Sequence, residues 1–298
     1  MANRKNKSQL IEEVKVQLSS KGVKCLQAEA DADYILTSTT TSYAEVHTDC
    51  PVVLVGTDTD LLVMLIDKVT CKNVYMMYSR NNVYKISGMQ EVMHHQSRRH
   101  ILLAHAITGC DTVSALFSIG KKRALTVLEN HSQCDMFDKF KKCDSSHDEI
   151  ARVGENFLLH LYKCNKSTSL DKSRYILYTQ KVSKMSSSFK LESLLPTSAA
   201  AKYHSYRTYF TIQKWLGNLG KLDPTDWGWE CQENMLTPIL TDRPVAPEQV
   251  LLIISCGCKQ GCENRCRCCK TGMFCTTRCL SCTGQTCTNS CPPDGEDD

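Results

Sequence analysis

Two features of the sequence predict a layered α/β domain followed by a small, irregular cysteine-rich module. Over residues 1–131, helical and strand-like patterns alternate, as they do where helices cover a parallel sheet. Eleven of the 19 cysteines crowd into residues 256–291, where too few apolar side chains occur to build a hydrophobic core. We expect an α/β domain at 1–131, a mixed helical connector at 132–250, a zinc module at 251–291 and an acidic tail at 292–298.

The first helices and strands are predicted from the spacing of apolar residues. Leu10, Val14 and Leu18 recur at helical spacing in a helix over 8–19. The clearest strand covers 51–56, an apolar run ended by glycine that is typical of a strand buried on both faces of a parallel sheet. The other elements expected are a strand at 23–26, a helix at 29–37, a helix at 61–66, strands at 74–78 and 83–86, and helices on both sides of a Gly-Cys-Asp break at 109–111.

The cysteine spacing indicates metal ligands rather than disulfides. Cys256 and Cys258 are too close to pair comfortably, whereas two thiolates at this spacing suit one metal. The chain shows no secretory signal peptide and only scattered cysteines before residue 250, which is typical of a reducing compartment. Cys269 and Cys291 stand outside the regular series. The series comprises Cys256, Cys258, Cys262, Cys266, Cys268, Cys275, Cys279, Cys282 and Cys287.

This series resembles the CXC domain of the tesmin type, which binds DNA through a cluster of three zinc ions. Nine thiolates can fill twelve coordination positions only if three of them bridge two ions each. Basic residues lie between the expected ligands, where a metal would hold the backbone rigid and suit it to DNA contacts. They are Lys259, Arg265, Arg267 and Lys270. The alternatives are ordinary solvated charges, or a zinc module that contacts another protein and not DNA.

Carboxylates follow or flank the predicted elements of the α/β domain. Asp58 and Asp60 come at the carboxyl end of the clearest strand, Glu29 and Asp31 open the helix before it, and Asp111 follows the Gly-Cys break. Clustered carboxylates repel one another unless a cation neutralises them, and hard oxygen ligands suit Mg²⁺ or Mn²⁺. Taken singly, each acid could instead cap a helix or favour its first turn.

The order of these motifs resembles the flap endonuclease family of PIN-like nucleases. The resemblance covers roughly residues 10–131 and implies that Glu29, Asp31, Asp58, Asp60 and Asp111 are metal-site acids. It also implies a helix–two-turn–helix at about 105–131 that grips duplex DNA. The residues at its second turn are Ile119, Gly120, Lys121, Lys122 and Arg123.

The match departs from the family at its start. The family's sheet begins with a strand that ends in a metal-binding aspartate, and the 28 residues before Glu29 contain no such strand. We therefore expect a nuclease site that is eroded and inactive as written. A working Mg²⁺- or Mn²⁺-dependent structure-specific nuclease is the alternative.

A nuclease-like domain followed by a tesmin-type module resembles proteins derived from animal transposable elements. The Leu195-Pro-Thr-Ser198 segment, with His204, Arg207 and Trp215, is similar to their middle region. The sequence contains no apolar run of 18 residues that would span a membrane. We expect a nuclear, DNA-binding protein that is neither secreted nor membrane-bound. A protein-interaction module built on zinc is the second alternative.

Overall fold

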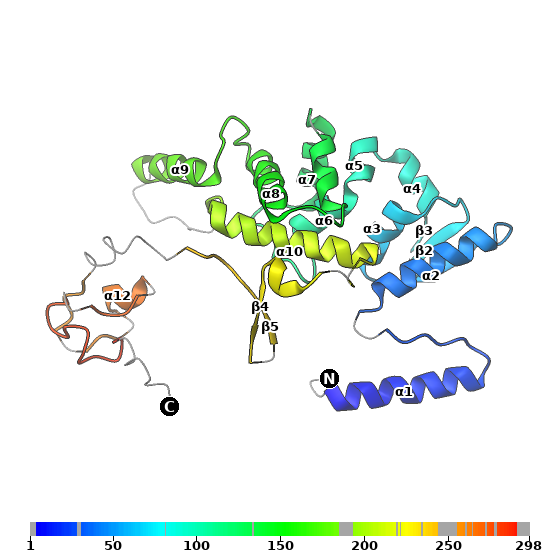
Figure 1. Ribbon diagram of the computed structural model, residues 1–298, viewed down its shortest axis with the longest axis horizontal. Coiled ribbons are helices and arrows are strands. Elements are labelled where there is room, and N and C mark those ends of the chain that lie inside the picture. The colour runs from blue at the N-terminus through cyan, green and yellow to red at the C-terminus, as the bar shows by residue number, and fades with distance from the viewer. Residues whose placement is uncertain are drawn as a thin grey trace. The chain divides into compact units, whose positions relative to one another are not determined.

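The computed structural model describes residues 4–28, 31–80, 82–132, 134–184, 193–218, 220, 222–233, 235–243, 255–259, 261–263, 265–271, 273–276 and 279–290. The chain divides into two compact units, Met1–Leu240 and Thr241–Asp298. The first combines many helices with two small sheets, and the second is nearly free of regular structure (Figure 1).

A three-stranded sheet lies at one end of the first unit. Strand β1 (Val52–Val55) pairs in parallel with β2 (Val74–Ser79), and β2 pairs antiparallel with β3 (Asn82–Lys85). Antiparallel pairing follows from the short β2–β3 connection, which leaves no room for a crossover. Helix α3 (Thr59–Lys68) connects the parallel strands and buries most of its residues against the core.

The structure corrects three expectations for this region. Residues 23–26 belong to no strand: among the described residues no strand pairs with them, and the Val23 amide donates to the Leu18 carbonyl. The helix expected at 29–37 instead forms α2 (Asp33–Val46), and Glu29 lies outside the described residues. Strand β1 is covered on one face only: Leu54 is 4% exposed, whereas Val53 is 43% and Val55 70% exposed.

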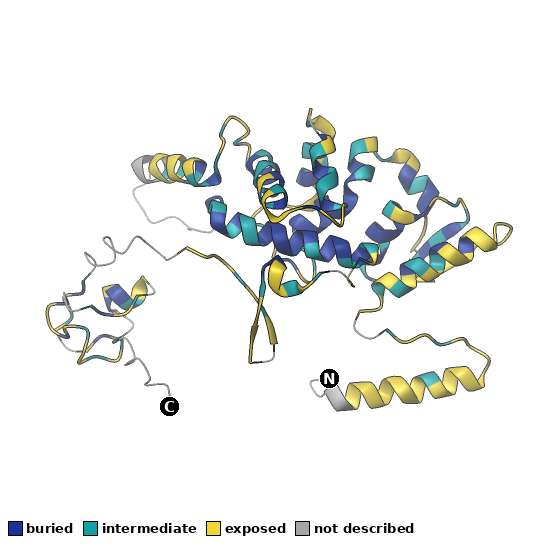
Figure 2. Ribbon diagram, viewed as in Figure 1, coloured by how far each residue is buried: buried dark blue, intermediate teal, exposed yellow. Residues whose placement is uncertain are grey.

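Helix α10 (Ser198–Leu216) is the central helix of the first unit and is buried over most of its length (Figure 2). It packs against α8 (His147–Leu161) and α6 (Ile101–Ile107). The Thr197 hydroxyl caps its start by accepting from the Ala200 amide. Helices from the range expected to be a connector therefore share one hydrophobic core with the α/β elements.

The other helices and the second sheet complete the first unit. The Tyr209 hydroxyl of α10 donates to the Lys142 carbonyl, and the Gln213 amide donates to the Phe140 carbonyl, so α10 also holds the loop before α8. The elements are α1 (Arg4–Ser20), α4 (Ile86–Val92), α5 (His95–Arg99), α7 (Lys121–Asn130), α9 (Leu170–Lys184), the 3₁₀ helices η1 (Cys134–Phe140) and η4 (Pro224–Trp227), and the hairpin of β4 (Trp229–Gln232) and β5 (Met235–Pro238).

The second unit is an irregular module whose core is made of cysteines. Its one short helix among the described residues is α12 (Arg267–Lys270), and a single bridge joins Cys275 to Ser290. Seven of its cysteines are buried although few other apolar side chains surround them. Among the described residues of the chain, no helix has the length and apolar character needed to cross a membrane.

Candidate metal centre and carboxylate pocket

The described cysteines of the second unit form three overlapping sets of four. Within each set, all four sulfurs lie within 4.8 Å of one another, a geometry that could hold a metal ion. The first set is Cys256, Cys262, Cys266 and Cys275; the second is Cys256, Cys268, Cys275 and Cys279; the third is Cys262, Cys275, Cys282 and Cys287.

The sulfur separations match those of thiolates that share a tetrahedral ion. A Zn–S bond of about 2.3 Å and tetrahedral angles give sulfurs about 3.8 Å apart, whereas a disulfide needs about 2.05 Å. The Cys256 and Cys262 sulfurs are 3.7 Å apart, the Cys256 and Cys275 sulfurs 3.9 Å, and the Cys268 and Cys279 sulfurs 3.7 Å. These cysteines are free thiols, so the cluster could hold zinc.

The protonation of the thiols shows why such a cluster needs a cation. Burial raises the pKa of Cys262 and of Cys275 because it removes water from the charged thiolate, and neighbouring thiols raise it further. Burial acts in the same direction on Cys279, yet its pKa falls to about 6 because the amides of Cys256 and Thr276 donate to its sulfur. A divalent ion would stabilise the remaining thiolates in the same way.

One cysteine of the regular series lies outside the three sets. Cys258 is partly buried and packs against the cluster, as does Cys269, which the spacing placed outside the series. Cys291 falls outside the described residues. The structure thus brings eight of the nine predicted ligands together and leaves Cys258 beside them.

All four basic residues predicted to contact DNA are exposed on this module. Arg267 and Lys270 lie on α12, between buried cysteines, while Lys259 and Arg265 lie on the loops before it. Their backbone is tied to the cluster: the Lys270 amide donates to the Cys266 carbonyl. The cluster therefore holds these side chains on a short, constrained stretch of chain.

A second cluster, in the first unit, consists of five aspartates around a cavity of about 160 Å³. Four of them were predicted from the sequence, and Asp33 was not assigned to the site. The cavity is lined by Asp31, Asp33, Asp58, Asp60, Asp111, Thr112, Thr211, Lys214 and Trp215. Thr211, Lys214 and Trp215 come from α10, whose sequence carries no signal that would place it at the sheet edge.

Several of these aspartates already have partners. The Asp58 carboxylate caps α3 by accepting from the Asp60 amide at 2.9 Å, as the simpler reading of this residue expected. Asp60 is buried, and its Oδ1 lies 2.5 Å from Nε2 of His105. Lys214 forms an ion pair with Asp31 at 2.7 Å.

Asp33 is the aspartate whose charge is least well accommodated. Burial and the neighbouring Asp31, Asp58 and Asp60 raise its pKa to about 6. Lys214 offsets only part of this effect. Among the described residues that line it, the pocket therefore carries more negative charge than Lys214 balances.

The turn predicted to grip DNA lies at the start of α7. Gly120 caps the helix with an extended backbone, and Ile119 beside it is buried. Lys121 donates from Nζ to the Gly109 carbonyl at 2.8 Å, while Lys122 is exposed and Arg123 half-buried. DNA contact by this turn stays a prediction.

Comparison with family models, curated proteins and solved structures finds no match for this chain.

Proposed function

We propose that this chain is a DNA-binding protein whose C-terminal module is folded by three zinc ions. The proposal rests on the three overlapping sets of cysteines, since each set supplies the four sulfurs of a closed structural zinc site. Zinc would here provide folding free energy and a rigid backbone, because the module has almost no other core.

The way the sets overlap suggests which thiolates bridge. Cys256 belongs to the first and second sets and Cys262 to the first and third. Cys275 is the one residue that the second and third sets share. If these three residues bridge, each pair of ions shares one sulfur, and Cys258 completes the first ion in place of Cys275. All nine cysteines of the regular series then have a role, which explains why Cys258 packs beside the cluster.

The cluster would be negatively charged, and this charge would stabilise basic residues around it. Three zinc ions and nine thiolates carry a formal charge of roughly −3. Exposed Lys259, Arg265, Arg267 and Lys270, less the one negative charge of exposed Glu263, offset that charge and lie on a constrained backbone. Cationic side chains in this setting suit phosphate contacts, which position a protein on duplex DNA.

Binding of the zinc-loaded full chain to a duplex oligonucleotide tests the proposal. Affinity should fall with salt, by roughly 0.9 log unit per log unit of salt for each neutralised phosphate. Replacing Arg265 and Arg267 with alanine should weaken binding and flatten the slope, whereas Arg80→Ala, at an exposed site in the first unit, should change neither. Salt-independent binding, or none, would favour a module that contacts protein.

A second candidate function concerns the aspartate pocket, where among the described residues no three carboxylates converge as the cysteine sulfurs do. Two-metal hydrolysis needs ions about 3.5–4 Å apart, held by acids from several elements. The Asp58 carboxylate caps α3, Asp60 contacts His105, and Asp31 forms an ion pair with Lys214. We therefore propose an eroded site that hydrolyses DNA poorly or not at all.

Incubation with a flapped duplex in Mg²⁺ or Mn²⁺ tests this second proposal. The native chain, Asp58→Ala and Asp111→Ala should all be equally inert. Metal-dependent cleavage that both substitutions abolish would establish the active nuclease instead. The origin in a transposable element rests on the sequence resemblance alone.

A further inference from the structure

One edge of the sheet in the first unit is open and carries unpaired backbone groups. The amides of Val52 and Gly56 donate to the Asn73 and Met77 carbonyls on the β2 side. Because the amides and carbonyls of successive strand residues point to opposite sides, those of Val53 and Val55 point away from β2. In the described part of the chain, β1 has no strand on that second side.

Nothing in β1 protects this edge from pairing. Natural edge strands carry charges, prolines or bulges that discourage another strand. The sequence Val52–Val55 has none of these, and its pairing with β2 is regular. Val53 and Val55 are exposed on the same face, so their side chains as well as their backbone groups are available to a partner.

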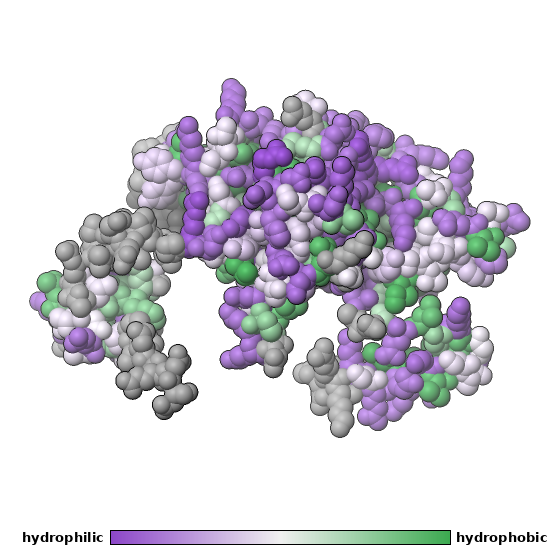
Figure 3. Space-filling view, in the orientation of Figure 1, coloured by the Kyte–Doolittle hydropathy of each residue, from purple (hydrophilic) through white to green (hydrophobic). Residues whose placement is uncertain are grey.

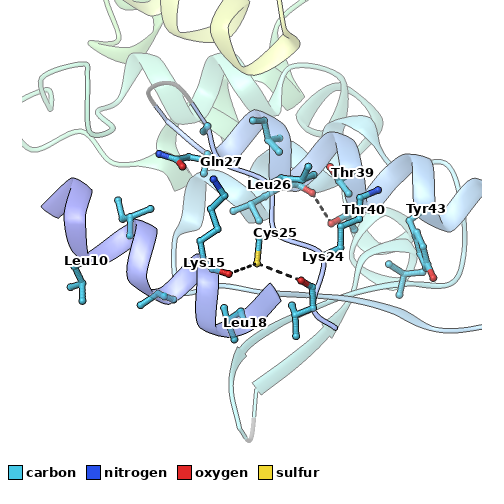
Figure 4. A pocket seen from close by; sticks show the side chains of 18 residues that line it. Leu10, Lys15, Leu18, Lys24, Cys25, Leu26, Gln27, Thr39, Thr40 and Tyr43 are labelled. Carbon is cyan, nitrogen blue, oxygen red and sulfur yellow. Dashed lines mark hydrogen bonds between the residues drawn. The ribbon is translucent and has the colours of Figure 1, made fainter. Parts of the chain in front are cut away.

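An apolar cavity of about 680 Å³ lies at the start of the same strand. Val52 lines it together with α1 and α2, and Figure 4 shows Leu10 and Leu18 of α1 across from Tyr43 of α2. These side chains are exposed, although apolar residues of this size normally pack. Figure 3 shows hydrophobic surface, in green, over α1. The cavity therefore places a surface suited to apolar side chains beside Val52, the first residue of β1.

We propose that an extended strand of a partner protein pairs with the open edge of β1. Only a strand offers amides and carbonyls spaced to meet those of Val53 and Val55, as in β-augmentation. Its side chains would enter the cavity. This inference does not depend on zinc or DNA.

Charge defines the partner strand further. Lys15 and Lys24 are the charged residues that line the cavity, near the start of β1. The aspartate pocket follows its end, where Asp58 is partly exposed and Asp60 is buried against His105. The partner strand is therefore apolar in its middle, acidic or neutral beside Val52 and basic beyond Val55.

Labelled synthetic peptides test the proposal on the zinc-loaded full chain. Two peptides have an alternating valine–threonine middle, glutamates at one end and lysines at the other, and differ only in direction. A second pair, with the same two sequences, is N-methylated at alternate residues, which blocks backbone pairing. We expect one unmethylated peptide to bind, to slow hydrogen exchange of the Val53 and Val55 amides, and to bind roughly tenfold more tightly than its methylated form.

Val53→Pro is the matched protein variant, because it removes an amide that β2 does not use, and Val53→Thr is its control. The proline variant should bind roughly tenfold more weakly and the threonine variant like the native chain. Equal binding of methylated peptides, no binding of any peptide, or unchanged amide exchange would overturn the proposal. Slow hydrogen exchange of the Val53 and Val55 amides in the free chain would also overturn it. If the free chain then has the mass of a dimer, a second copy of the chain covers the edge.

Discussion

Replacing Cys275 with serine should damage the cysteine cluster more than replacing a cysteine that serves one ion, such as Cys287. Its sulfur belongs to all three sets, whereas the sulfur of Cys287 belongs to one. If Cys275 bridges two ions, its loss removes a ligand from both at once. Structural zinc sites supply on the order of 10–16 kcal/mol of folding free energy in small peptides, and this module has no apolar core to replace it.

The expected zinc content follows from this sharing. Native chain should bind about three ions, Cys287→Ser about two, and Cys275→Ser one or none. Cys269→Ser is the matched control, because Cys269 packs against the cluster but belongs to none of the sets. It should keep all three ions. Mass spectrometry under native conditions, after removal of loosely bound metal, measures each value.

The thermal stability of the two units separates this effect from general misfolding. The first unit has its own hydrophobic core of residues between Ala44 and Trp227, so its melting temperature should not change in any of these variants. Loss of one ion from both Cys275→Ser and Cys287→Ser would refute the bridging role. A native chain with no zinc and intact disulfides would refute the cluster itself.

Two further predictions concern the first unit. Burial and neighbouring acids raise the folded-state pKa of Asp33 from 3.8 to about 6, so the stability that protonated Asp33 contributes is lost as pH rises through about 6. Asp33→Asn should remove this loss. A difference in melting temperature between native chain and variant that stays the same from pH 4 to 7 would contradict the prediction. Gly154→Ala should destabilise the unit by about 1–3 kcal/mol, because a Cβ there would lie 2.0 Å from the Ser205 hydroxyl where α8 meets α10. Gly88→Ala in α4 is the control, because a Cβ there would lie 4.0 Å from its nearest neighbour, the Lys85 Cβ. This substitution should leave the denaturation midpoint unchanged or raise it. Equal effects of the two substitutions would show that the close contact at Gly154 does not matter.

Local pattern was sufficient for the parts of this protein that depend on neighbours in sequence. The run at 51–56 became β1, and 74–78 and 83–86 became β2 and β3 with small changes at their ends. The cysteine spacing singled out the nine residues of which eight meet in the three sets. In a segment of about 35 residues without a core, the thiols are almost the only groups that can be buried together.

Long-range packing decided the rest. Whether β1 is covered on one face or two depends on which helices reach it, and its valines are equally apolar in both cases. Lys214 meets Asp31 across 183 positions of sequence, and no periodicity in either segment predicts that pair. Asp33 and Asp31 are both acids at a helix start, but only the fold gives Asp31 the lysine and leaves Asp33 facing three carboxylates. The charge balance of this pocket depends on residues from elements far apart in the sequence. It cannot be predicted from the sequence of any one of these elements.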